Sequence, residues 1–90
     1  MKETKFDIAE YLETPEDIQA FLDEAMKTGS SEEFIHALNT AARAKGMTEI
    51  AEKAGVSRPS LYKSLAANSN PGFDTVNKVV HALGCKLVIG

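Results

Sequence analysis

Residues 57–63 bring together the side chains of the sequence best able to bind a nucleic acid. The stretch reads Ser-Arg-Pro-Ser-Leu-Tyr-Lys, so hydroxyl, guanidinium, phenol and ammonium groups fall within seven residues. An arginine can donate two parallel hydrogen bonds to the edge of a guanine. Lysine, serine and tyrosine can donate to phosphate oxygens, which fix the position of a protein on a duplex. The pattern therefore favours a binding surface over a catalytic centre.

The sequence lacks the patterns that support catalysis or metal binding. His36 and His81 stand far apart, and no serine or cysteine has a base at a recognisable spacing. The sequence contains no glycine-rich phosphate loop and no CxxC or HxxxH motif. We therefore expect no enzyme activity, no catalytic residues, no metal and no cofactor. Cys85 is expected to be a small packing residue rather than a reactive thiol.

Length and composition indicate one small domain in a reducing compartment. The chain has 90 residues and is 43% hydrophobic, enough for one core but not for two. No apolar run approaches the roughly 20 residues of a membrane span, and residues 1–11 contain no apolar stretch of signal-peptide length. Its single cysteine excludes an internal disulfide. We expect a cytoplasmic protein with no membrane partner.

Charge is divided unevenly along the chain. Residues 1–34 contain three lysines and ten acidic residues, a net charge of −7. Residues 35–90 contain seven basic and three acidic residues, a net charge of +4. Two surfaces of opposite charge favour two different partners. For the acidic part alone, a solvated face without a partner remains an equal alternative.

Two longer helices are predicted in the first half of the chain. Thr14 is a typical N-cap, and the following proline fits the first helical turn because its missing N–H would be unpaired there. An apolar stripe with helical spacing follows, formed by Ile18, Phe21, Leu22, Ala25 and Met26. The helix is expected to end at Gly29. The second helix starts with Ser30 and Glu33 at capping-box spacing and ends at Gly46.

Three shorter helices and a strand complete the prediction. The helices cover residues 48–54, with Thr48 as N-cap, residues 58–67, and a final segment marked by Phe73, Val76, Val79, Val80 and Leu83. Residues 85–90 are β-prone and need a partner strand, either residues 5–9 or a second copy of the chain. Residues 1–13 fit a strand or a helical turn equally well.

The predicted fold class is all-α, a small bundle of five to six helices with a short C-terminal β-strand. Its parts are an acidic N-terminal segment (1–29), a helical bundle (30–84) and the terminal strand (85–90).

Residues 47–66 have the pattern of two helices joined by a tight turn. Ala51 is small enough to let the helices cross closely, and Gly55 can adopt the positive φ of such a turn. Apolar residues at positions 50, 54, 56, 61 and 65 would pack the pair together. This spacing resembles the helix-turn-helix of the Xre/Cro family (lambda-repressor-like) of DNA-binding proteins. The resemblance includes RAKG upstream and NPGFDTVNKVVHALG downstream.

In that family the second helix enters the DNA major groove, so the resemblance implies a set of contacts. Arg58 is expected to contact a guanine, Lys63 a phosphate or a guanine, and Tyr62 a phosphate or a thymine methyl group. The other expected DNA-binding residues are Thr48, Ser57, Pro59, Arg43 and Lys45. A solvated Arg58, a purely capping Ser57 and a partly packed Tyr62 are the alternatives.

Over residues 6–89 the chain resembles the HigA-like antidote proteins of addiction modules. The distinguishing feature is FDIAEYL before the acidic helix TPEDIQAFLDEAM, because an ordinary Xre domain lacks it. The resemblance implies a bacterial, nucleoid-associated antitoxin that binds a RelE-type mRNA interferase toxin. It also implies a homodimer that binds double-stranded operator DNA and represses its own operon.

The toxin is expected to meet folded surface, because the sequence has no disordered toxin-binding tail. A basic toxin would be attracted to the acidic N-terminal segment. The expected toxin-binding residues are Glu10, Glu13, Glu16, Asp17, Asp23 and Glu24. Two other functions stay open: a stand-alone Xre/Cro-type repressor of phage or host origin without a toxin partner, and a helix-turn-helix reduced to a protein-interaction module.

Overall fold

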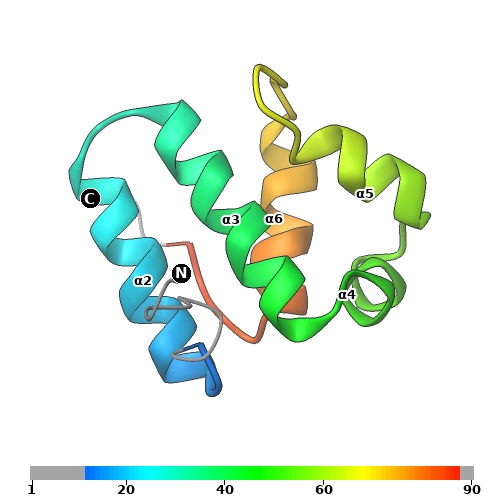
Figure 1. Cartoon of the computed structure of the whole chain (residues 1–90), viewed down its shortest axis with the longest axis horizontal. Helices are drawn as coiled ribbons and strands as arrows, with labels where there is room; N and C mark the ends of the chain where they lie inside the picture. Colours follow the sequence, from blue (N-terminus) through cyan, green and yellow to red (C-terminus); the bar gives the residue numbers. More distant parts are fainter. Residues whose placement is uncertain (1–11, 88–90) are drawn as a thin grey trace, which may run out of the picture.

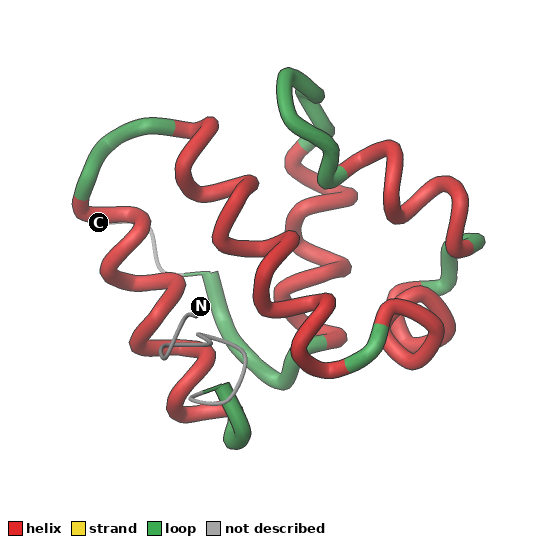
Figure 2. The backbone as a smooth tube through the Cα atoms, viewed as in Figure 1, coloured by secondary structure: helices red, strands yellow, loops and turns green. Residues whose placement is uncertain are grey.

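The computed structural model describes residues 12–87, which form five α-helices joined by loops (Figure 1). The helices are α2 (Pro15–Lys27), α3 (Ser31–Lys45), α4 (Met47–Ala54), α5 (Arg58–Ser64) and α6 (Phe73–Ala82). Figure 2 shows only helices and loops in this part of the chain. The predicted small all-helical fold is therefore confirmed for residues 12–87. None of these helices is long and apolar enough to cross a membrane.

The helix starts at Thr14 and Ser30 confirm the capping signals. The Thr14 hydroxyl accepts from the backbone N–H of Asp17 at 3.1 Å, and the Asp17 carboxylate accepts from the N–H of Thr14 at 3.3 Å, a complete capping box. The Ser30 hydroxyl accepts from the N–H of Glu33. The Ser30 N–H donates to the Thr28 hydroxyl at 3.3 Å instead of to Glu33, so the second predicted capping box is only half formed.

The prediction that Thr48 caps the third helix was wrong. Helix α4 begins one residue earlier, at Met47, and its N-cap is Gly46, which provides no side-chain hydrogen bond. Gly46 has a φ of 107°, a conformation that glycine adopts far more readily than other residues. Met47 is buried, and packing of this side chain in the core favours the earlier start.

Helices α3 and α6 lie in the middle of the bundle. Helix α3 packs against α2, α4 and α6, and α4 packs against α5 and α6. Leu38 of α3 and Val80 of α6 are completely buried, beside small residues such as Ala41 and Ala42. Figure 1 shows α2 at one edge of the molecule and α4 and α5 at the opposite edge. Helix α2, which carries the acidic residues, is therefore separated by the core from α5, which carries Arg58 and Lys63.

The segment that follows α6 forms no strand over residues 85–87. The backbone N–H of Lys86 donates to Oε1 of Gln19, and the Lys86 carbonyl accepts from Nε2 of Gln19, both at 2.9 Å. A glutamine amide offers the same donor and acceptor as a peptide group, so one side chain replaces the expected partner strand. The rest of the predicted strand (88–90) lies outside the described residues. Of the segment 1–13, predicted as a strand or a helical turn, residues 12 and 13 form neither, and residues 1–11 lie outside the described part.

One further helix end was predicted wrongly, and two apolar side chains are more exposed than the core residues of their helices. The helix predicted at 58–67 ends at Ser64, because Asn68 has a positive φ of 66° and the Ser69 hydroxyl donates to the Ser64 carbonyl at 2.6 Å. Met26, part of the apolar stripe predicted for the first helix, is 40% exposed, and Phe73, which begins the final helix as predicted, is 62% exposed. They stand in the last turn of α2 and at the first position of α6, where the core no longer covers the helix.

Candidate functional site

A turn at Gly55 joins α4 to α5 and sets the direction of α5. Gly55 is left-handed, with φ 75° and ψ 30°. The N–H of Val56 donates to the carbonyl of Ala51 at 3.0 Å and closes the turn. A Cβ atom at position 55 would meet no neighbouring atom within 4 Å, so the glycine is required for its backbone conformation rather than for space.

Helix α5 buries one side and exposes the other. Leu61, and Leu65 directly after the helix, are at most 2% exposed and hold it against the bundle. The five residues predicted at this helix are all exposed: Ser57, Arg58, Pro59, Tyr62 and Lys63. The structure therefore brings them together on the outer side of one short helix, where a macromolecule can contact them.

Arg58 and Tyr62 form a pair one helical turn apart on this side. Nη2 of Arg58 donates a hydrogen bond to the phenol oxygen of Tyr62 at 3.2 Å. The guanidinium carbon lies 5.6 Å from the centre of the Tyr62 ring, within the range of a cation–π contact. The guanidinium therefore has a preferred position along the helix before any ligand is present.

Ser57 has the predicted capping role, and it reveals a residue that the sequence analysis missed. Its hydroxyl accepts from the N–H of Ser60 at 3.2 Å and donates to the Ser60 hydroxyl oxygen at 3.0 Å. Because the Ser57 proton is used inside the helix, the exposed Ser60 keeps a hydroxyl proton for an outside acceptor. The spacing of two serines three residues apart at a helix start was the available signal.

The other predicted basic residues lie away from α5 and have partners in the chain. Nε of Arg43 donates to Oδ1 of Asn39 at 3.2 Å. Nζ of Lys45 donates to the carbonyl of Glu13 at 3.4 Å and so connects the end of α3 to the start of α2. The predicted Thr48 is exposed in the first turn of α4, on the same edge of the molecule as α5.

Lys53 of α4 forms an ion pair with Glu49, with 3.0 Å between Nζ and Oε2. The hydrogen bond and the charge of Lys53 lower the pKa of the Glu49 carboxyl. The basic charge that Lys53 would offer to a nucleic acid is therefore partly compensated on α4.

Comparison with known proteins decides the family. Residues 2–90 match the family described as "probable addiction module antidote protein". The chain belongs to this family of antidote proteins. A protein of Haemophilus influenzae, described as uncharacterized, is similar to it, with 43% identity over 84 residues that cover 93% of this chain and 87% of the relative. No solved structure matches the chain. An addiction-module antidote acts on a toxin, so a toxin partner follows from the family.

The acidic residues of this antidote protein lie along the exposed side of α2 and just before it. Glu13, Glu16, Asp17, Asp23 and Glu24 are all exposed, whereas Glu10 lies outside the described residues. Three of these carboxylates have local partners. Asp17 completes the capping box of α2, Asp23 accepts from Nε2 of Gln19 at 3.1 Å, and Glu24 pairs with Lys27 at 3.2 Å. Glu13 and Glu16 stand at the helix start, where negative charge also favours the helix.

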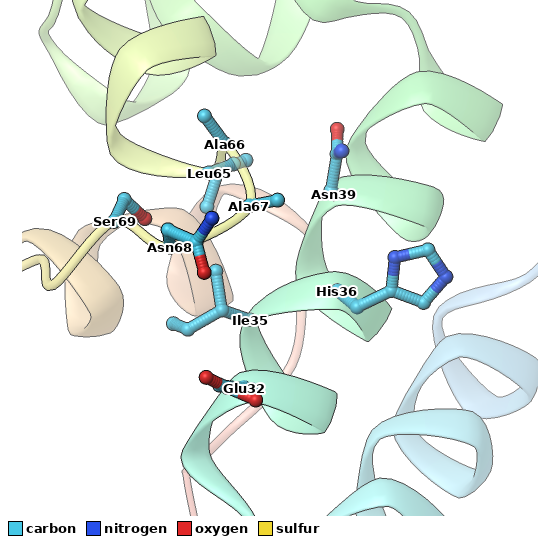
Figure 3. Close-up of a pocket in the computed structure, with 9 residues that line it drawn as sticks. All are labelled: Glu32, Ile35, His36, Asn39, Leu65, Ala66, Ala67, Asn68 and Ser69. Atoms are coloured by element: carbon cyan, nitrogen blue, oxygen red, sulfur yellow. The ribbon is translucent and has the colours of Figure 1, made fainter.

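A cavity of about 190 Å³ in the antidote protein lies between α3 and the loop after α5 (Figure 3). Its apolar wall includes Ile35, Leu65 and Ala67. Figure 3 shows the His36 ring on the side of α3 away from the loop, so the polar residues of the rim do not point to one centre. Among residues 12–87, no group of His, Cys, Asp or Glu residues is arranged to hold a metal ion.

Proposed function

We propose that this antidote protein is a helix-turn-helix repressor that binds its own operator through α5 and neutralises a RelE-type toxin through α2. The exposed row of polar side chains on α5, set in place by the turn at Gly55, carries the DNA-binding part of the proposal. The charge of α2 and its position on the opposite edge carry the toxin-binding part.

The size of α5 suits the major groove. With its side chains an α-helix is about 10–12 Å across. The major groove of B-DNA is about 12 Å wide, so the seven-residue α5 can enter it. With α5 in the groove, Arg58 reaches base edges while Lys63 and Ser60 reach phosphates. In this arrangement α4 lies across the DNA backbone, and the exposed Thr48 in its first turn is the proposed phosphate contact. Pro59, Arg43 and Lys45 remain secondary contacts in this proposal.

The DNA part is tested by fluorescence anisotropy with the promoter of the antidote gene and an unrelated duplex. Arg58→Ala is expected to reduce the preference for the promoter by about 5- to 150-fold, the value of one bidentate base contact. Lys63→Ala is expected to weaken both complexes equally and to lower the salt slope by about one. Lys78→Ala removes a charge that is paired with Asp74 on α6, and serves as the control. Binding that ignores Arg58→Ala and Lys63→Ala contradicts the proposal.

The toxin part predicts charge-driven association of a small basic protein with α2. Glu16→Lys combined with Glu24→Lys is expected to slow association with the product of the neighbouring toxin gene by about tenfold at low salt. Asp17 is left unchanged because its replacement would also break the helix cap. Glu52→Lys, an exposed reversal on α4, is the control. An unchanged association rate refutes the surface, and the absence of any complex would leave a stand-alone repressor.

The repressor is proposed to be a homodimer, because one helix reads too few base pairs and paired half-sites about 34 Å apart restore specificity. The start of α6 is the proposed contact. Phe73 stands beside an apolar groove of about 360 Å³ that Met26, Phe34, Val76 and Leu87 also line, and none of the described residues in its walls is charged. A protruding ring next to an apolar groove on the same surface suits a two-fold contact, in which each ring enters the groove of the other copy.

Light scattering tests the dimer. Phe73→Glu is expected to give a monomer at micromolar concentration, while Tyr62→Glu, which changes an exposed aromatic on the DNA side, leaves the dimer intact. A Phe73→Glu protein that stays dimeric would place the interface elsewhere.

A further inference from the structure

The pair formed by Arg58 and Tyr62 suggests how the proposed DNA contact gains its specificity. The guanidinium has five N–H donors, and Tyr62 uses one of them, on Nη2. Four donors remain, namely the Nε–H, the other N–H of Nη2 and the two of Nη1, which is enough for the two parallel bonds that a guanine edge accepts. The contact with Tyr62 is therefore compatible with base recognition and does not compete with it.

The tyrosine also restricts a side chain that would otherwise move freely. An exposed arginine side chain has many rotamers, and this freedom is lost when a ligand fixes it. Tyr62 is 39% exposed, and its ring and phenol oxygen both contact Arg58. Ring contact at 5.6 Å and the hydrogen bond at 3.2 Å hold the guanidinium on the same side of α5. Binding then costs less ordering of Arg58.

We propose that Tyr62 is a positioning residue, which acts through Arg58 to fix the guanidinium toward one guanine in each half-site. Its phenol oxygen accepts from Arg58, and its own O–H remains able to donate to a DNA acceptor. Tyr62 therefore determines specificity more than overall affinity. This inference rests on the proposed DNA binding, and it adds a second role to the expected contact of Tyr62 with a phosphate or a thymine methyl group.

The experiment compares Tyr62→Phe, which keeps the ring and removes only the hydroxyl, with the unchanged protein. Affinity is measured for the promoter duplex, for single base-pair variants of it and for an unrelated duplex. Tyr62→Phe is expected to reduce discrimination at one G·C pair by about three- to tenfold, the value of one hydrogen bond, with unrelated DNA bound equally well. Combined with Arg58→Ala, the same change is expected to have no further effect at that pair.

A second measurement does not depend on DNA. In the free protein, ¹⁵N relaxation of the Arg58 Nε–H group is expected to show a more mobile guanidinium in Tyr62→Phe than in the unchanged chain, with Arg43 as the internal reference. Equal mobility overturns the pairing, whatever DNA does. Reduced discrimination that persists together with Arg58→Ala overturns the positioning role, because Tyr62 would then contact the base pair itself. The unchanged protein could also fail to prefer its promoter while the mobility difference is present. That result refutes operator binding and base positioning, but the contact between Arg58 and Tyr62 stands.

Discussion

Gln19→Ala is expected to release the segment after α6 from α2 without unfolding the bundle. Gln19 makes two hydrogen bonds of 2.9 Å to the backbone of Lys86. Next to them, the thiol of the buried Cys85 donates to the Pro15 carbonyl at 3.5 Å. Alanine is the best helix former, so the substitution itself does not weaken α2. The change therefore isolates the attachment of residues 85–87.

The expected magnitude follows from the two lost bonds. A neutral hydrogen bond contributes about 0.5–1.5 kcal/mol, and these two are near the surface, where water replaces part of each. We expect the segment to open more easily by about 1–2 kcal/mol in total. Since 1.4 kcal/mol corresponds to a factor of ten, the open form becomes roughly 5 to 30 times more populated.

Cys85 is the natural reporter, because it is the only cysteine of the chain. Burial, followed by the charges of Asp23 and Glu16, raises the pKa of its thiol, so the closed form reacts slowly. When the segment opens and closes faster than the reagent reacts, alkylation of Cys85 is expected to be 5 to 30 times faster in Gln19→Ala than in the unchanged protein, roughly the increase in the open population. Glu24→Ala, an exposed change on the same helix, is the control. A rate within twofold of the unchanged protein would show that Gln19 does not hold the segment.

Three further outcomes are expected from local features. Gly55→Ala should lower the free energy of unfolding in urea by about 1–2 kcal/mol, because the backbone of Gly55 is left-handed although a Cβ there would meet no other atom. An unchanged free energy of unfolding would show that the turn is not left-handed. Ser57→Ala should cost about 1 kcal/mol in the same assay, and Ser57→Asp should restore most of it. Folding raises the pKa of the Cys85 thiol above its ordinary value near 9. The contribution of the protonated thiol to folding stability is therefore complete below that ordinary pKa and is lost as pH rises through the pKa of the folded state. Unfolding of Cys85→Ala at pH 7 and pH 10 should therefore show a smaller alkaline loss than the unchanged chain.

Local signals predicted most of the helix ends, since a cap acts within four residues. Thr14 and Ser57 hold their helices as their types indicated, and Gly55 has the positive φ that its position required. The start of α4 was missed because burial of Met47, a tertiary effect, decided between two neighbouring residues.

In the terminal segment, residues 85–87, a contact that is distant in the sequence overrode the local pattern. Its alternating apolar residues indicated a strand, but the hydrogen bonds of Lys86 are made by Gln19, which is 67 residues away in the sequence and belongs to a helix. No pattern of local spacing contains that contact. The strand prediction failed at 85–87 because a single side chain satisfied the backbone.

The candidate site was predictable as a surface but not as a set of contacts. Helical spacing placed Arg58, Tyr62 and Lys63 outside and Leu61 inside, as the structure has them. Residues four apart on a helix are neighbours. Whether Arg58 and Tyr62 actually touch depends on their rotamers, which the sequence does not state. For the same reason the hydroxyl pair of Ser57 and Ser60 was found only in the structure.

A net charge of −3 is compatible with the proposed binding of DNA to α5 at ordinary salt, because the acidic residues of α2 lie at the opposite edge of the molecule. The Cα atoms span 36 Å along the longest axis, and α2 and α5 stand at its two ends. The screening length is about 8 Å at physiological ionic strength but about 30 Å at 0.01 M. Below roughly 0.03 M the acidic helix should therefore repel DNA, and affinity should rise less steeply with falling salt than phosphate contacts alone predict. Glu16→Lys with Glu24→Lys should restore a straight logarithmic salt plot, and equal curvature in both proteins would refute this electrostatic separation.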